Sequence, residues 1–302
     1  TTTLTLTKAD VILKIASATL HYGESQNLTA TLQRVVDGSM LTNRPLTFKI
    51  DGTSIGTLST DGTGTSAFAY TLSDAVAVGD HTLTVEYAGD AGTNPGTGTA
   101  KLTCLKTTTA FSLNDIPARI GETKSLSAIL KRSTDKAGIV GRGVLFTLVG
   151  TQIGTPVTDA NGQATVSYKI EESLGVGKFA LKADFAGDSQ YSKSTKSVNL
   201  TVSQSPTKIS TNNSSGKQGS TVTLLANLLR TTDSKALNGK VLKFQIDGVD
   251  VGTATTDATG AASLSYMIPS TMSVGKHPIK VSFDGDTYYL KYTASGNTLT
   301  VK

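Results

Sequence analysis

The chain has 302 residues, of which 37% are hydrophobic and 17% charged, with no tryptophan and one cysteine, Cys104. This composition is typical of a globular protein, and a single cysteine excludes an internal disulfide. The net charge of +5 is not gathered into a dense lysine and arginine cluster, which argues against nucleic-acid binding, and no apolar run is long enough to span a membrane.

The first element in chain order is a predicted strand at residues 1–8, TTTLTLTK, in which threonine and leucine alternate. Leu4 and Leu6 stand 98 residues before Leu102 and Cys104, near the end of a later unit. The strand therefore resembles the last strand of a preceding unit.

A long internal repeat follows. Residues 78–90, VGDHTLTVEYAGD, return as residues 176–188 and 274–286, so that Gly79, Gly177 and Gly275 are 98 residues apart. A fixed long period indicates one structural unit that is repeated. We expect three domains, residues 9–106, 107–204 and 205–302, each large enough to bury a core of its own.

Each unit has the pattern of a two-sheet β-sandwich. Segments with alternating apolar residues are separated by glycine turns, which predicts about seven strands per unit and no helix. In the first unit the predicted elements are a strand at 10–15, a turn at 22–24, apolar alternation at Leu28, Ala30 and Leu32 and at Leu46, Phe48 and Ile50, a turn at Asp61–Gly64, and alternation at Phe68, Tyr70 and Leu72.

The two linkers, near residues 106–108 and 204–206, are short and not rich in glycine and serine. We therefore expect the units to stack into a semi-rigid rod. Three sandwiches end to end would reach on the order of 120 Å.

These motifs carry a family resemblance. The segments F-K-I-D-G at 48–52, T-D-G-T-G at 60–64, V-G-D-H at 78–81 and Y-A-G-D at 87–90 recur with substitutions in the other two units. They resemble the bacterial Ig-like domain repeats of group 3. The resemblance implies tandem immunoglobulin-like sandwiches in bacterial surface and secreted proteins, as stalks, adhesins or fibre components, without catalytic residues. The first unit departs at residues 91–98, which lack the tyrosine found at Tyr191 and Tyr289.

Candidates for chemistry are few. His81 and His277 take the place of Phe179, which favours strand residues over metal ligands or catalysts. The repeated aspartates follow threonine or glycine in turns, where their carboxylates typically cap the local backbone; calcium needs six to eight oxygens, so calcium at the junctions is the weaker alternative. We therefore expect no metal and no cofactor. The aspartates are Asp61, Asp159 and Asp257, and Asp90, Asp188 and Asp286.

The tyrosines fall into two groups. Tyr70, Tyr168 and Tyr266 are predicted to face the core. Tyr288, Tyr289 and Tyr292 form a cluster that is a possible contact patch for a carbohydrate or another surface ligand, or else a packed final loop.

The sequence therefore favours a non-enzymatic extracellular structural protein of a bacterial cell surface, a rod that assembles into a fibre or serves as a stalk. The alternative is an adhesin that binds carbohydrate or protein through its end loops.

Residues 1–8 carry the most specific hypothesis. An alternating strand without its own sandwich invites pairing with another chain, and head-to-tail pairing would give a filament. The first unit has 6 Lys+Arg against 9 Asp+Glu, and the third has 10 against 6, which favours their contact. Against it, the third unit already has a closing strand, and a strand remnant of a longer tandem array would look the same. The predicted self-association residues are Thr1, Thr2, Thr3, Leu4, Thr5, Leu6, Thr7 and Lys8 with Thr298, Leu299, Thr300 and Val301.

Overall fold

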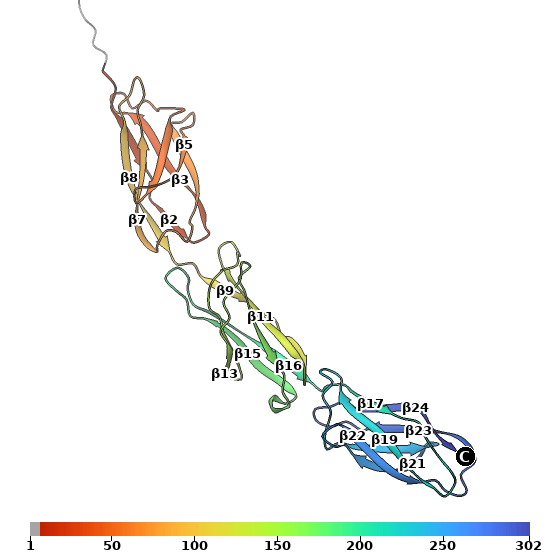
Figure 1. Cartoon of the computed structure of the whole chain (residues 1–302). Coiled ribbons are helices and arrows are strands. Elements are labelled where there is room, and N and C mark those ends of the chain that lie inside the picture. The colour runs from red at the N-terminus through yellow and green to blue at the C-terminus, as the bar shows by residue number, and fades with distance from the viewer. Residues whose placement is uncertain (1–6) are drawn as a thin grey trace, which may run out of the picture.

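The computed structural model describes residues 7–302 as three β-sandwiches arranged one after another in an extended row (Figure 1). The predicted fold class, all-β with three tandem immunoglobulin-like sandwiches, is confirmed. One short 3₁₀ turn, Glu172–Leu174, lies between the strands of the second unit.

Each unit contains eight strands. The first unit comprises β1 (Val11–Ile15), β2 (Ala18–His21), β3 (Ser25–Arg34), β4 (Pro45–Ile50), β5 (Thr53–Ser59), β6 (Thr65–Thr71), β7 (Gly79–Tyr87) and β8 (Gly96–Leu105). The second comprises β9 (Thr109–Ser112), β10 (Ile116–Arg119), β11 (Thr123–Arg132), β12 (Leu145–Leu148), β13 (Thr151–Gly154), β14 (Gln163–Lys169), β15 (Gly177–Phe185) and β16 (Ser194–Ser203). The third comprises β17 (Thr207–Thr211), β18 (Ser214–Gly216), β19 (Thr221–Arg230), β20 (Val241–Ile246), β21 (Val249–Thr255), β22 (Ala261–Met267), β23 (Gly275–Phe283) and β24 (Tyr292–Val301).

The same topology occurs three times. In the first unit a three-stranded sheet, β1-β3-β6, faces a five-stranded sheet, β2-β8-β7-β4-β5. The pairings are antiparallel except for β2 with β8, which run parallel. The equivalent pairs in the other units, β10 with β16 and β18 with β24, are also parallel.

The single strand predicted at 10–15 is in fact followed by a second one, which the sequence analysis missed. β1 belongs to the three-stranded sheet and β2 to the five-stranded sheet. The chain crosses from one sheet to the other at Ala16 and Ser17, so the ladder must break there. This crossing explains why each unit has eight strands rather than seven.

The core lies where the alternation predicts it. Phe48, Phe146 and Phe244 are fully buried, and so is Cys104. Burial of such side chains drives the two sheets together. Tyr70, Tyr168 and Tyr266 are only half-buried and pack at the margin of the core.

The repeated aspartate turns are stabilised by hydrogen bonds among their own residues. Asp61 accepts hydrogen bonds through Oδ1 from the backbone N–H groups of Thr63 and Thr65 at 2.8 and 3.0 Å. Gly64 has a φ of +73°, a conformation that glycine adopts without strain, and a Cβ there would crowd Met40. The same Asp–Gly turn lies at Asp159 and Asp257.

Candidate functional site: the two junctions between units

Within residues 7–302 no three His, Cys, Asp or Glu side chains lie together in a way that could hold a metal ion. In the same residues no helix is long and apolar enough to cross a membrane. The remaining candidate sites are hydrogen-bonded pairs, surface hollows and contacts between units.

His81 and His277 each pair with an aspartate that the sequence analysis did not connect to them. His81 Nδ1 lies 2.6 Å from Asp51 Oδ2, and its Nε2 lies 2.9 Å from the carbonyl oxygen of Ala77. His277 repeats this with Asp247 at 2.5 Å. Because both ring nitrogens face acceptors, the protonated ring is favoured, and the hydrogen bond to the aspartate raises the pKa of each histidine. Each histidine ring therefore fastens two loops, and both of its nitrogens are engaged.

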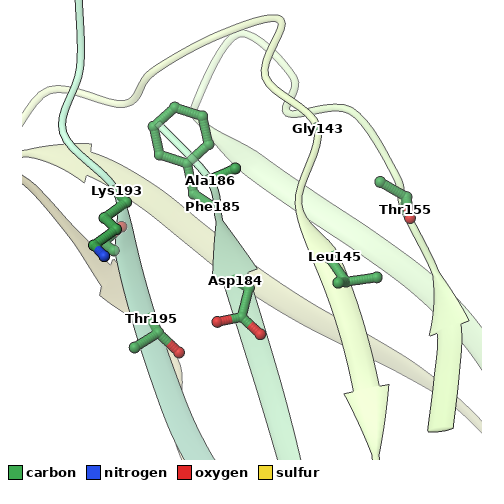
Figure 2. Close-up of a pocket in the computed structure, with 9 residues that line it drawn as sticks. Gly143, Leu145, Thr155, Asp184, Phe185, Ala186, Lys193 and Thr195 are labelled. Carbon is green, nitrogen blue, oxygen red and sulfur yellow. The ribbon is translucent and has the colours of Figure 1, made fainter. Parts of the chain in front are cut away.

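A surface hollow of about 560 Å³ lies on the second unit beside β12, β15 and β16 (Figure 2). It is lined mostly by apolar groups, including Leu145 and Phe185, and its one acidic residue, Asp184, pairs with Lys182 at 2.8 Å. β12 and β13 are shorter than their counterparts, and Pro156, which has no N–H to donate, follows β13. The hollow lacks the converging polar groups of a catalytic site.

The contacts that cross from one unit to the next are more specific. At the first junction the Tyr191 hydroxyl donates a hydrogen bond to Asp74 Oδ1 at 2.8 Å. The rings of Tyr191 and Tyr22 lie 6.0 Å apart, and Tyr22 is fully buried. Tyr191 therefore combines apolar packing with one directed polar contact to the preceding unit.

Two hydroxyl groups fix the backbone at the same junction. Thr107 and Thr134 both donate to the carbonyl oxygen of Tyr22, at 2.9 and 3.1 Å. The Gln190 side chain also donates to the carbonyl oxygen of Asp74 at 2.7 Å. These bonds come from separate loops of the second unit, so they restrain rotation as well as separation.

Arginines cover the glycine turns and support the tyrosine. Arg132, held by Asp135 at 2.8 Å, lies so close to Gly23 that a Cβ there would overlap its guanidinium. Arg142 pairs with Asp188 at 2.6 Å and lies 5.3 Å from the ring centroid of Tyr191, within cation–π range.

The second junction repeats this arrangement 98 residues later. The Tyr289 hydroxyl donates to Glu172 Oε1 at 2.5 Å, and Thr232 donates to the carbonyl oxygen of Ile120 at 3.0 Å. Lys240 takes the place of Arg142: it pairs with Asp286 at 2.5 Å and lies 5.0 Å from the Tyr289 ring centroid.

Arg230 makes the second junction more highly charged than the first. Its side chain is 0% exposed, and it pairs with Asp233 at 2.6 Å and with Glu172 of the preceding unit at 3.3 Å. A Cβ on Gly121 would overlap its guanidinium. The fully buried guanidinium is thus neutralised by carboxylates from both sides of the junction.

The pKa values follow from these contacts. Burial and the bond to Asp74 raise the pKa of Tyr191 to about 12, and burial and Glu172 raise that of Tyr289. Burial alone would raise the pKa of Glu172, but the bond from Tyr289 and the charges of Lys235 and Arg230 outweigh it, so that the pKa is lowered. The bond from Arg230 lowers the pKa of Asp233 to about 2. At neutral pH both tyrosines are therefore donors, and Glu172 and Asp233 are ionised.

The predicted tyrosine patch is corrected by this geometry. Tyr289 is 1% exposed, so it does not belong to an exposed contact patch. Tyr288 is half-buried against the core of the second unit, and Tyr292 begins β24. The packed-loop alternative describes Tyr288 and Tyr289.

The predicted self-association residues lie at the two ends of the sequence. Thr1–Leu6 lie outside the described residues, whereas Thr7 and Lys8 are exposed. At their other proposed end, Leu299–Val301 of β24 pair with β18 on one side and β23 on the other. A second strand cannot flank β24 there, and self-association through Thr298, Leu299, Thr300 and Val301 would require displacement of β24.

The acidic partners Asp74 and Glu172 were missed. In the sequence, Asp74 and Glu172 are 98 residues apart, as Tyr191 and Tyr289 are. That coincidence of spacing was the available signal.

Several solved structures of tandem domains are similar to this chain at low sequence identity. No curated protein matches the chain. Among solved structures, a three-domain segment of titin has a TM-score of 0.45 at 12% identity, covering 98% of this chain and 100% of that chain. The Escherichia coli adhesin FdeC has a TM-score of 0.33 at 15% identity, covering 100% of both chains. A Ca²⁺-stabilised, ice-binding adhesin of an Antarctic bacterium has a TM-score of 0.29 at 17% identity, covering 99% of this chain and 74% of that chain.

The family model of the bacterial Ig-like domain (group 3) matches residues 13–104, 112–203 and 209–302. These three matches span nearly the whole sequence and coincide with the three sandwiches. The chain therefore belongs to the bacterial Ig-like domain family (group 3), of which it contains three consecutive members.

Proposed function

We propose that this chain is a non-enzymatic spacer of a bacterial cell-surface or secreted protein, a stalk that holds whatever it joins at a fixed separation. The observation that supports this most is that the two junctions use equivalent contacts. Tyr191 with Asp74 and Tyr289 with Glu172 join successive units in the same way. A chain of flexibly linked beads would not need a repeated, buried contact between its units.

Packing across the junctions supports a stiff spacer. The apolar cluster of the first unit continues through Tyr22 to Tyr191, Leu130 and Ile139 of the second unit. Tyr288 of the third unit likewise packs against the core of the second. Bending at either junction would expose these side chains and break several hydrogen bonds, each worth about 0.5–1.5 kcal/mol net.

The contacts of the acidic and histidine side chains are also consistent with a spacer. In residues 7–302 the acids and histidines discussed above form hydrogen bonds or ion pairs within turns, between loops and at the junctions. Recognition of a carbohydrate or protein by end loops, and assembly into a filament, stay predictions for which the described contacts supply no specific support.

Small-angle X-ray scattering of the full chain tests the proposal. A stiff spacer gives a maximum dimension on the order of 120 Å that is unchanged between dilute and concentrated samples. A compact particle, or a flexible one whose scattering requires many conformations, would contradict it. Retention of a soluble glycan or host protein at the chain ends would instead favour an adhesin, and concentration-dependent growth would favour a filament.

A further inference from the structure

We propose that the tyrosine–carboxylate pair is the recognition element of the junction: a unit that carries the tyrosine docks only on a sandwich end that offers the carboxylate. This inference rests on the proposed spacer function and identifies the partner of each docking surface. It further implies that the two outward faces of the molecule do not fit each other through this contact.

Of the contacts that both junctions share, the tyrosine–carboxylate pair joins the residues that lie farthest apart in the sequence. The Tyr191 hydroxyl reaches Asp74 over 117 residues of chain, and the Tyr289 hydroxyl reaches Glu172 over the same separation. Both tyrosines are 1% exposed. A buried phenol needs an acceptor, so a neighbouring end without one is rejected.

The outward N-terminal face of the first unit lacks the tyrosine. Thr93 stands in its place, 98 residues before Tyr191, and is 1% exposed. Its hydroxyl is already used inside the unit, because it lies 2.8 Å from the Tyr87 hydroxyl and donates to Asp90 Oδ1 at 2.7 Å. Thr93 therefore has no donor to offer to a preceding sandwich.

Two other residues of that face also differ from the residues that donate hydrogen bonds at the internal junctions. Val36, which is 78% exposed, stands where Thr134 and Thr232 donate to the preceding unit. Arg34 is kept, but its side chain is 41% exposed and 3.9 Å from Asp37, whereas its counterpart Arg230 is 0% exposed. Among the described residues, this face keeps the arginine of a junction but lacks the tyrosine and threonine hydroxyls that donate to the preceding unit.

The outward C-terminal face of the third unit lacks the carboxylate. Exposed Ser270 stands 98 residues after Glu172. Gln218 stands at the position that buried Tyr22 and Ile120 hold in the other two units. Its side chain donates to the carbonyl oxygen of Met272 within the third unit. Among the described residues nothing occupies the space over Gly219, which arginines fill over Gly23 and Gly121.

Both members of the pair are thus present at the internal junctions, and each is missing from the outward face where it would be needed. A second copy of this chain, docked head to tail, would meet Thr93 with Ser270 in place of a tyrosine with a carboxylate. This contact therefore does not extend from one chain to the next.

Spin-label distance measurements on the full chain test the recognition pair. Labels at Ser54→Cys and Ser197→Cys span the first junction, and labels at Ser197→Cys and Ser263→Cys span the second; all three positions are exposed, while Cys104 is buried. Tyr191→Phe should replace a narrow distribution with a broad one at the first junction only, and Tyr289→Phe at the second only. The control, Tyr87→Phe, removes a buried hydroxyl that does not cross a junction and should change neither distribution.

Asp74→Ala removes the acceptor instead of the donor and should reproduce the effect of Tyr191→Phe. Unchanged distributions in both variants would overturn the inference, even if scattering shows that the chain is extended. A flexible unmodified chain would instead refute the spacer proposal itself.

Sedimentation of the unmodified chain at high concentration tests the two outward faces. A monomer is expected. Head-to-tail association that Val36→Asp abolishes would contradict the inference that the two outward faces do not fit each other.

Discussion

Replacement of Arg230 by methionine tests the energetics of the second junction. The substitution keeps an unbranched side chain of similar length but removes the guanidinium that bridges Asp233 and Glu172. The equivalent Arg34→Met at the outward face of the first unit is a matched control, because Arg34 has the same place in its unit and no unit docked over it in the described part of the chain.

The magnitudes of the two changes should differ. Breaking a buried ion pair costs about 3–5 kcal/mol because a charge is left without its partner. The carboxylates of Asp233 and Glu172 are 23% and 36% exposed and regain part of their hydration, so we expect about 2–3 kcal/mol for Arg230→Met. The Arg34–Asp37 pair is 3.9 Å long with both side chains at least 41% exposed, and its loss should cost no more than about 0.5 kcal/mol.

Scanning calorimetry of the full chain measures both effects, with circular dichroism as a second readout because the chain has no tryptophan. The three sandwiches give a multi-unit transition, so each variant is compared with the parent under one set of conditions. Equal destabilisation by Arg34→Met and Arg230→Met would refute the reasoning. It would show that the docking of the third unit on the second does not strengthen the ion pairs of Arg230.

Three further predictions follow from the fold. Phe146→Ala should destabilise its unit by about 3–5 kcal/mol in urea titrations, and Phe48→Ala and Phe244→Ala should do the same; a small effect would mean that these positions are not core. The raised pKa values of His81 and His277 mean that their pairing adds stability in full below about pH 6.5, which is lost as pH rises through the folded pKa. The melting temperature should fall over that window, and His81→Phe with His277→Phe should remove this dependence. A chelator should leave the melting temperature unchanged, because Glu172, Asp188 and Asp286 pair with Arg or Lys and Asp74 accepts a hydrogen bond from Tyr191; a drop of several degrees would support calcium binding.

The fold could be predicted from the sequence because its signals are local. Alternation placed Phe48, Phe146 and Phe244 in the core, and the Asp61–Gly64 turn follows from the chemistry of its own four residues. The change of sheet between β1 and β2 was missed because apolar alternation looks the same in either sheet.

The junctions were harder to predict for a physical reason. The departure at Thr93 from Tyr191 and Tyr289 was visible in the sequence, but a tyrosine in the loop before a strand does not show which residue it contacts. Its partner lies 117 residues earlier, and only the stacking of one folded sandwich on another brings the two together. The partnership of His81 with Asp51 was hidden in the same way, since a turn aspartate and a strand histidine meet only after the sheet has formed.

If the proposed function is right, the two junctions hold the three sandwiches as one stiff body. Residual dipolar couplings of the full chain in a weakly aligning medium test it most directly, because each unit reports its own alignment. We expect a single alignment tensor that fits all three units, with the same axes and magnitude. Separate tensors of different magnitude for the three units would contradict it.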